Sequence, residues 1–161
     1  MRGSQIIVSG SPKGTFLEGT IQGTNLYPGI AVSVVLGVAA DGSGNMTWQP
    51  LTSTSFLDPR LKAILLNDDN QGFIYSVAYI TGTRCKIYCP LPGEDMNLCV
   101  AAQVGTGSAN AYTVGERLAP SNSTGQFTNS SVSSSSNAWA TVMEHIDITA
   151  DVVGWVWCKI Q

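Results

Sequence analysis

Residues 84–100 read RCKIYCPLPGEDMNLCV, and this stretch decides the fold. In its first six residues, Cys85, Ile87 and Cys89 alternate with polar side chains, a pattern typical of a half-buried β-strand. The Pro-Leu-Pro-Gly sequence at residues 90–93 predicts a turn, and the apolar residues around Leu98 predict a second strand. We therefore expect a strand, a turn and a strand.

The same stretch contains three of the four cysteines. On a strand that rises about 3.3 Å per residue, Cys85 and Cys89 are roughly 13 Å apart. That separation is too large for a shared zinc ion, with Zn–S distances of about 2.3 Å, or for a disulfide, with Cα atoms within about 7 Å. A site built on Cys99 would need Cys158 and His145 from distant parts of the chain. We expect four free thiols packed as small apolar side chains, with no metal and no cofactor, in preference to a metal site or an incidental disulfide.

Outward from this stretch, short apolar runs recur with turn residues between them. Clear examples are the β-branched run after Pro28, the segment around Trp48, the aromatic run 73–80 and the final run 152–160. Such spacing predicts an all-β fold, a small β-barrel or sandwich.

One segment has a helical pattern, at about residues 58–67. Asp58 is a suitable N-cap, Pro59 suits the first helical position, and Leu61, Ile64 and Leu65 share one helical face. We expect one short helix there.

The first 25 residues are rich in Gly, Ser and Thr, with sparse apolar residues. These are Ile6, Ile7, Val8, Phe16 and Leu17. We expect an extended N-terminal arm over residues 1–25 that gains order from a partner, with an ordinary edge strand as the alternative. Residues 26–161 are then a single β-barrel domain, a size that buries a sizeable core.

Only 12% of the 161 residues are charged, against 43% hydrophobic, and the net charge is −3. The eight basic residues are scattered, which argues against a nucleic-acid partner. No apolar run reaches the roughly 18 residues of a membrane span, and the N-terminus does not resemble a signal peptide, so we expect synthesis in the cytoplasm. Low charge suits a protein whose surface is covered in an assembly.

Candidate catalytic residues are few. His145 is the one histidine, and it alternates with Met143 and Asp147 on an expected strand, which favours a surface or pore-lining position. Ser108 lacks the second glycine of a nucleophile elbow. We expect that the protein is not an enzyme.

Bulky aromatic residues are the more prominent feature of the last third. Trp155 and Trp157 share one face of the final strand, and Trp139 lies one strand earlier. These side chains either fill the interior or form a subunit interface, and both alternatives remain open.

The succession of landmarks over residues 56–160 resembles the head decoration (cement) proteins of tailed double-stranded DNA bacteriophages. The pieces are DPRLKAILLNDDNQG with an aromatic strand, YITGTRCKIYCPLPGEDMNLCVAA, YTVGERLAP with GQF, and AWATVMEHIDITADVVGWVWCKI. In these proteins a Pro-x-x-Gly-acid turn precedes an Asn-Leu strand, a hydrophobic-Gly-acid-x-Leu element follows, and the chain ends in a Trp-Val strand. Here these are Pro90 to Leu98, Val114 to Leu118, and Trp155 to Trp157.

The resemblance implies a β-barrel subunit, a homotrimer on the outer surface of the phage capsid, made in the host cytoplasm. It implies binding to the major capsid protein and stabilisation of the head by bridging capsomers. The arm with its five apolar residues is then the capsid-binding segment, adding a strand to a capsid edge. The alternatives are a phage tail or fibre module, perhaps one that binds glycans, and a secreted carbohydrate-binding module.

Overall fold

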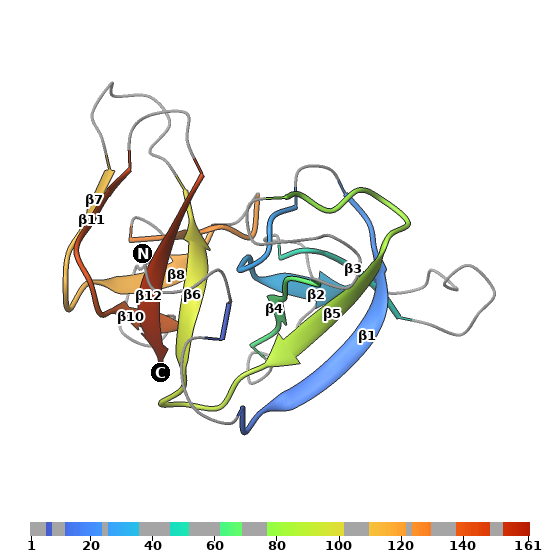
Figure 1. The fold of residues 1–161 in the computed structure, drawn as a ribbon, viewed down its shortest axis with the longest axis horizontal. Helices are drawn as coiled ribbons and strands as arrows, with labels where there is room; N and C mark the ends of the chain where they lie inside the picture. Colours follow the sequence, from blue (N-terminus) through green and yellow to red (C-terminus); the bar gives the residue numbers. More distant parts are fainter. Residues whose placement is uncertain are drawn as a thin grey trace.

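The computed structural model describes residues 6–7, 12–23, 26–35, 46–51, 62–68, 77–101, 110–121, 124–129, 138–148 and 153–161. In these ranges every regular element is a β-strand, which confirms the predicted all-β class. None of the described ranges holds a helix with the length and apolar character needed to cross a membrane. Figure 1 shows two groups of strands side by side, a closed barrel and a curled sheet.

The curled sheet has the strand order β2-β3-β1-β5-β4. Its strands are β1 (Thr15–Ile21), β2 (Val32–Val34), β3 (Met46–Pro50), β4 (Ile64–Leu65) and β5 (Arg84–Cys89). β1 runs parallel to β3, and the other neighbours are antiparallel.

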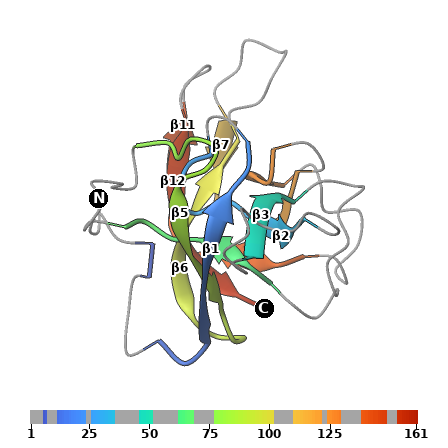
Figure 2. The same ribbon diagram turned by 90° about the vertical axis from the view of Figure 1, so that its right-hand side faces the viewer.

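The two outer strands of this sheet approach each other. Ala31 and Ile64 form a β-bridge, the Val32 N–H donates to the Ala63 carbonyl at 2.9 Å, and the Leu65 N–H donates to the Ile30 carbonyl at 3.0 Å. The sheet therefore curls almost into a second barrel, which Figure 2 shows from the side of β1. Curling satisfies edge groups that would otherwise be open to another chain.

The closed barrel has the strand order β10-β12-β6-β9-β8. Its strands are β6 (Asp95–Val100), β8 (Arg117–Pro120), β9 (Phe127–Thr128), β10 (Ala140–Val142) and β12 (Gly154–Ile160). A two-stranded ribbon of β7 (Asn110–Tyr112) and β11 (Ile146–Ile148) rises beside the upper part of β12 (Figure 1).

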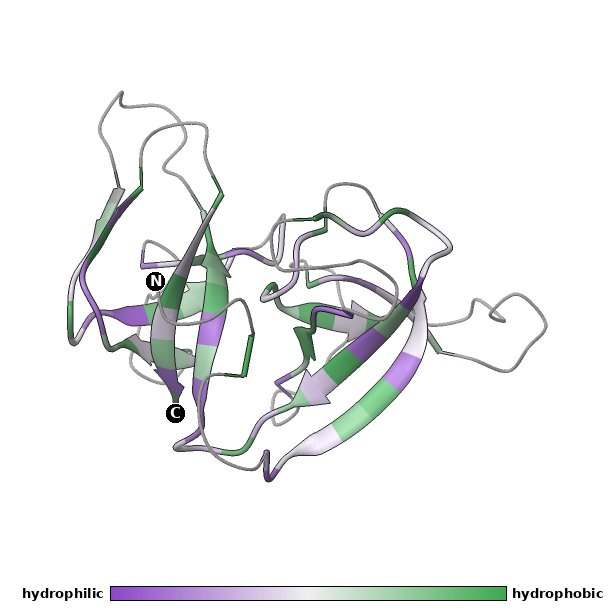
Figure 3. Ribbon diagram, in the orientation of Figure 1, coloured by the Kyte–Doolittle hydropathy of each residue, from purple (hydrophilic) through white to green (hydrophobic). Residues whose placement is uncertain are grey.

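The two groups of strands have separate cores that share a wall. Residues of the wall alternate between the cores along the chain, so Leu98 packs in the barrel while Cys99 packs in the curled sheet. The wall residues in the barrel core are Ala31, Ile64, Leu66, Tyr88, Met96, Leu98 and Val100; those in the sheet core are Ile30, Val32, Ala63, Leu65, Cys85, Ile87, Cys89 and Cys99. Figure 3 shows the apolar positions along β5, β6 and β12.

A glycine lets two parts of this wall approach closely. Gly29 has φ of +92°, and a Cβ added to it would lie 2.8 Å from the backbone nitrogen of Cys99. The Cys99 N–H donates to the Gly29 carbonyl at 3.1 Å. A side chain at position 29 would therefore both strain the backbone and push β6 away.

The predicted helix at about residues 58–67 is wrong for the part that the structure describes. Ile64 and Leu65 form strand β4 and pair with Tyr88 and Ile87 of β5. Residues 58–61 lie outside the described residues. The run from Ala63 to Leu66 is buried on both faces, and this produces the apolar pattern that also fits a short helix.

The segment expected as an arm over residues 1–25 differs from that expectation where it is described. Thr15–Ile21 is strand β1, in the middle of the curled sheet between β3 and β5, so it is neither a free arm nor an edge strand. Ile6 is fully buried in the barrel core. These residues belong to the folded domain, and the expected boundary at residue 25 does not divide an arm from a barrel.

Candidate functional surfaces

The structure separates the residues predicted to bind a capsid. Ile6 is buried, and Ile7 and Leu17 are half-buried against the two cores. Phe16 is the one among the four described residues with a largely exposed side chain, at 52%. Val8 lies outside the described residues. Of the residues predicted as the capsid-binding segment and described by the structure, Phe16 is therefore the one with a largely exposed side chain.

An anchor joins the start of β1 to the turn between β5 and β6. The Glu94 carboxylate accepts hydrogen bonds from the Lys13 N–H at 2.7 Å, the Leu91 N–H at 2.6 Å and the Tyr88 hydroxyl at 2.5 Å. The Tyr88 hydroxyl in turn accepts from the Gly14 N–H at 2.7 Å. One carboxylate thus joins two backbone segments, at Lys13 and at Leu91, and the side chain of Tyr88. We call this arrangement the Glu94 anchor.

The anchor keeps a charged carboxylate beside a neutral phenol. Burial and the hydrogen bond to Glu94 raise the pKa of Tyr88 to about 12. Burial also raises the pKa of Glu94, but hydrogen bonds from the Lys13 N–H, the Tyr88 hydroxyl and the Leu91 N–H outweigh it, so the net pKa is lowered. The sequence predicts the acidic turn, but it gives no indication that the Lys13 N–H, 81 positions away, donates to Glu94.

The turn between β7 and β8, residues 113–116, has the same construction. The Glu116 carboxylate accepts from the Thr113 N–H at 2.9 Å, three residues earlier. Gly93 and Gly115, each just before the glutamate, have φ of +90° and +91°. That backbone conformation favours glycine, and glycine there is typical of a type II turn.

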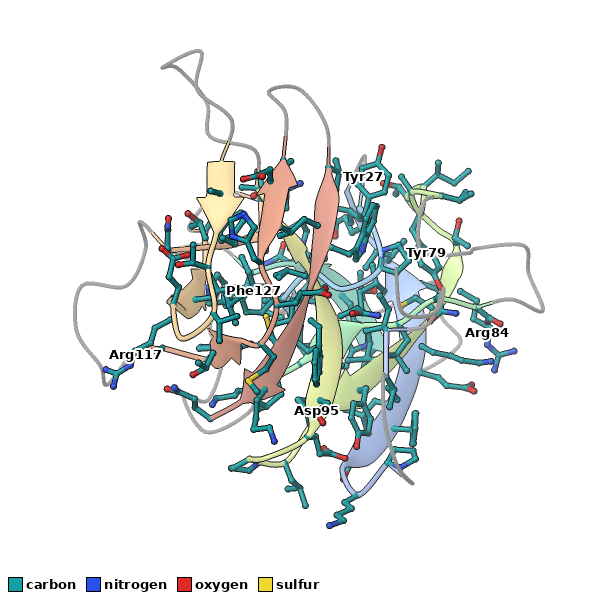
Figure 4. All side chains as sticks on the ribbon, turned by 60° about the vertical axis from the view of Figure 1, so that its left-hand side comes forward. Tyr27, Tyr79, Arg84, Asp95, Arg117 and Phe127 are labelled. Atoms are coloured by element: carbon teal, nitrogen blue, oxygen red, sulfur yellow. The ribbon has the colours of Figure 1, made fainter. Side chains whose placement is uncertain are left out.

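Trp155 lies at the junction of the two cores. Its indole packs against both hydrophobic clusters, and Nε1 donates to the Pro28 carbonyl at 2.8 Å. Figure 4 shows Tyr27, whose ring meets the Trp155 ring edge-on with centroids 6.0 Å apart. Trp155 is therefore half-buried and packs against its own chain.

Trp139 and Trp157 are also half-buried. The Trp139 ring meets Phe127 of the barrel core edge-on, with centroids 6.0 Å apart. Trp157 shares the outer face of β12 with Trp155, because Val156 and Cys158 point into the barrel. A role of these side chains in a subunit interface stays a prediction.

All four cysteines are free and buried. Burial raises the pKa of Cys85 to about 12 and raises the pKa of Cys89, Cys99 and Cys158. Among the described residues, no three His, Cys, Asp or Glu side chains are placed to hold a metal ion. The thiols act as packing groups.

His145 lies at the surface, in the link between β10 and β11. Its Nε2 is 3.4 Å from Oδ2 of Asp147, and the two side chains are 56% and 67% exposed. Exposed pairs of this kind contribute little to stability. Glu144, next to them, accepts instead from the Trp157 N–H at 2.9 Å and so engages β12.

Several large apolar side chains are exposed to solvent. They are Phe16, Met46, Val77, Ile80, Leu91 and Val114. Phe16 and Leu91 flank the Glu94 anchor: the Phe16 ring lies 4.8 Å from that of Tyr88, and Leu91 begins the turn. Figure 4 shows Arg84 and Arg117 extending outward on opposite sides, far from a common basic patch.

No family model matches this sequence, and a comparison with curated proteins finds no match either. The structure brings together three features that bear on function. They are an anchored turn with exposed apolar neighbours, a tryptophan-bearing strand and a buried set of thiols.

Proposed function

We propose that this protein is a structural decoration (cement) protein of a tailed bacteriophage head. It binds the major capsid protein on the outer surface of the assembled shell, as a homotrimer, and bridges neighbouring capsomers without catalysing a reaction. The observation that carries the proposal is the order of three landmarks: the turn at Pro90–Leu98, the turn at Val114–Leu118 and the strand at Trp155–Trp157.

The apolar surface beside the Glu94 anchor supports the proposal. The Phe16 side chain, near the start of β1, is 52% exposed, and the Leu91 side chain, in the turn after β5, is 48% exposed. Hydrogen bonds of the Glu94 anchor hold the backbone beside both residues. An apolar side chain on a fixed backbone loses little conformational entropy when it is covered. With few charges available for steering, attachment is dominated by apolar and backbone contacts.

Association of several copies strengthens such a contact. A trimer that engages three equivalent capsid sites gains affinity through effective concentration, even when each contact is weak. A low-charge chain is suited to this setting, since much of its surface becomes covered.

Co-sedimentation with heads of the encoding phage, purified without this protein, tests the proposal. We expect binding to expanded heads that persists at about 1 M salt, because screening weakens exposed charge pairs but not apolar contacts. Phe16→Asp and Leu91→Asp should each weaken the affinity for heads at least about tenfold, a loss of about 1.4 kcal/mol in the free energy of binding.

Ile80→Asp is the matched control, because Ile80 is 67% exposed but precedes the opposite end of β5. Release at high salt, or equal losses in all three variants, would contradict the apolar contact. Gold-labelled antibody on the tail instead of the head would favour the tail or fibre alternative.

A further inference from the structure

Two residues near the N-terminus pair with one edge of β6 at an isolated β-bridge. Ile7 and Met96 are antiparallel bridge partners, and the Asn97 N–H donates to the Ile6 carbonyl at 2.7 Å. The Ile6 N–H donates to Oδ1 of Asn67 at 3.4 Å. The Ile6 side chain is 0% exposed and belongs to the barrel core. The segment thus binds by backbone pairing and by one buried apolar side chain.

This pairing completes a row of partners along one edge of β6. Further along that edge, the Cys99 N–H donates to the Gly29 carbonyl and the Ala101 N–H donates to the Phe127 carbonyl at 2.9 Å. Removing Ile6 and Ile7 would take away the carbonyl that the Asn97 N–H binds and would open an apolar socket beside it. The site is therefore built for an extended segment with an apolar side chain.

The chain is held independently a few residues later. The Glu94 anchor binds the backbone of Lys13 and Gly14, and β1 begins at Thr15. Residues 8–11, Val-Ser-Gly-Ser, connect the two attachments. Detaching residues 1–11 leaves every pair of β1 intact, and Ile6, seven residues before Lys13, then reaches at most roughly 23–25 Å from it. That reach exceeds the radius of gyration expected for a domain of this size, about 15 Å.

We propose that the Met96–Asn97 edge of β6, with the socket for Ile6, is a strand-accepting site for the N-terminal segment of a second copy of this chain. The intramolecular pairing already shows that the site fits this sequence, and every copy carries the same segment. An exchanged segment makes the same contacts as the intramolecular one, so exchange costs little apart from association. The inference concerns self-association and does not depend on binding to a phage head.

Concentration decides which copy supplies the segment. A short linker gives the chain's own segment an effective concentration on the order of millimolar. Exchange therefore becomes competitive when copies are held together at similar local concentrations, as in a lattice or in a concentrated solution. At micromolar concentration the intramolecular arrangement dominates.

A trans-complementation assay tests the acceptor site. A chain that begins at Pro12 is titrated with a synthetic peptide of residues 1–11, followed by calorimetry and by thermal unfolding. We expect 1:1 binding that raises the midpoint of unfolding, and at least about tenfold weaker binding for the peptide with Ile6→Asp, since this buries a charge. Equal binding of both peptides, or none to a folded truncated chain, would overturn the acceptor site.

Experiments on the full-length chain test whether a second copy supplies the segment that occupies the site. They do not require the truncated chain to fold. Deleting Ser9 and Gly10 shortens the linker without touching Ile6 or β6, and inserting Gly-Ser-Gly-Ser lengthens it. Sedimentation at up to about 1 mM should show more oligomer for the short linker and less for the long one. Adding Ile6→Asp to the short-linker chain should abolish the oligomer. A monomeric short-linker chain, or an oligomer that survives Ile6→Asp, would refute exchange.

Discussion

Replacing Glu94 with glutamine removes the charge of the Glu94 anchor while keeping its shape. Three donors lie 2.5–2.7 Å from the carboxylate oxygens: the Lys13 N–H, the Leu91 N–H and the Tyr88 hydroxyl. A hydrogen bond to a charged acceptor contributes about 1 kcal/mol more than a neutral one, so three contribute about 3 kcal/mol when buried. Because Glu94 is half-buried, we expect a loss of about 2 kcal/mol in the free energy of unfolding, a fall of about 4–8 °C in Tm.

The pH dependence of this loss follows from the pKa of Glu94. The folded-state pKa is below the ordinary value of 4.5, so the folded chain holds this carboxylate ionised where the unfolded chain would protonate it. The stabilisation is complete above the unfolded pKa and disappears as the pH falls through the folded pKa. The stability difference between the wild type and Glu94→Gln is therefore full at pH 7 and closes at pH values well below 4.5.

Urea unfolding at pH 7 and at about pH 3, followed by tryptophan fluorescence, measures that difference. Glu116→Gln is the control, because Glu116 occupies the same position in a similar turn, where one backbone donor binds it at 2.9 Å. We expect a loss below about 1 kcal/mol for this variant at pH 7. A Glu94→Gln loss no larger than the control, or one that stays constant down to pH 3, would refute the anchor.

Three further predictions concern the packing of the two cores. The four thiols should resist an aromatic disulfide reagent at pH 8 in the native protein and react fully in guanidinium. The reason is that burial raises their pKa values, that of Cys85 to about 12. Rapid reaction of the native protein would contradict this. Gly19→Ala should lower stability by about 1–3 kcal/mol in urea unfolding, because its Cβ would lie 2.1 Å from the Met46 carbonyl oxygen, whereas Thr20→Ala next to it should cost less. Trp155→Phe should cost about 1–2 kcal/mol by leaving the Pro28 carbonyl without the indole donor, and an unchanged midpoint would show that this bond contributes nothing.

The sequence alone is enough to predict two strands that follow each other directly along the chain. The alternation in RCKIYC predicts β5, the Pro-Leu-Pro-Gly sequence predicts the turn, and the next apolar residues predict β6. Each of these signals arises within about eight residues. The partners of Glu94 in the Glu94 anchor could not be predicted from the sequence. Lys13 is 81 positions from Glu94, and nothing in the sequence GSPKG indicates that the Lys13 N–H donates to a distant carboxylate.

The incorrect helix and the incorrect arm have related physical causes. A strand that is buried on one face shows alternation, but β4 is buried on both, so its apolar run does not distinguish strand from helix. The N-terminal segment has the opposite character, because its apolar residues are sparse and its strand β1 contains a buried glycine, Gly19. Both segments take their structure from partners distant in sequence, and such partners override local preference.

The shared wall also explains why the cysteine-rich stretch is structural. Cys85, Cys89 and Cys99 all face the sheet core, while Tyr88 and Leu98 face the barrel core. Where β5 and β6 lie between the two cores, at Tyr88–Cys89 and at Leu98–Cys99, both faces are buried. At the start of β5 only the face of Cys85 is buried, because Arg84 on the other face is exposed. In both places burial desolvates the thiol, which stays protonated. The three thiols of RCKIYCPLPGEDMNLCV are therefore buried packing groups, and burial disfavours the thiolate that a reactive cysteine needs.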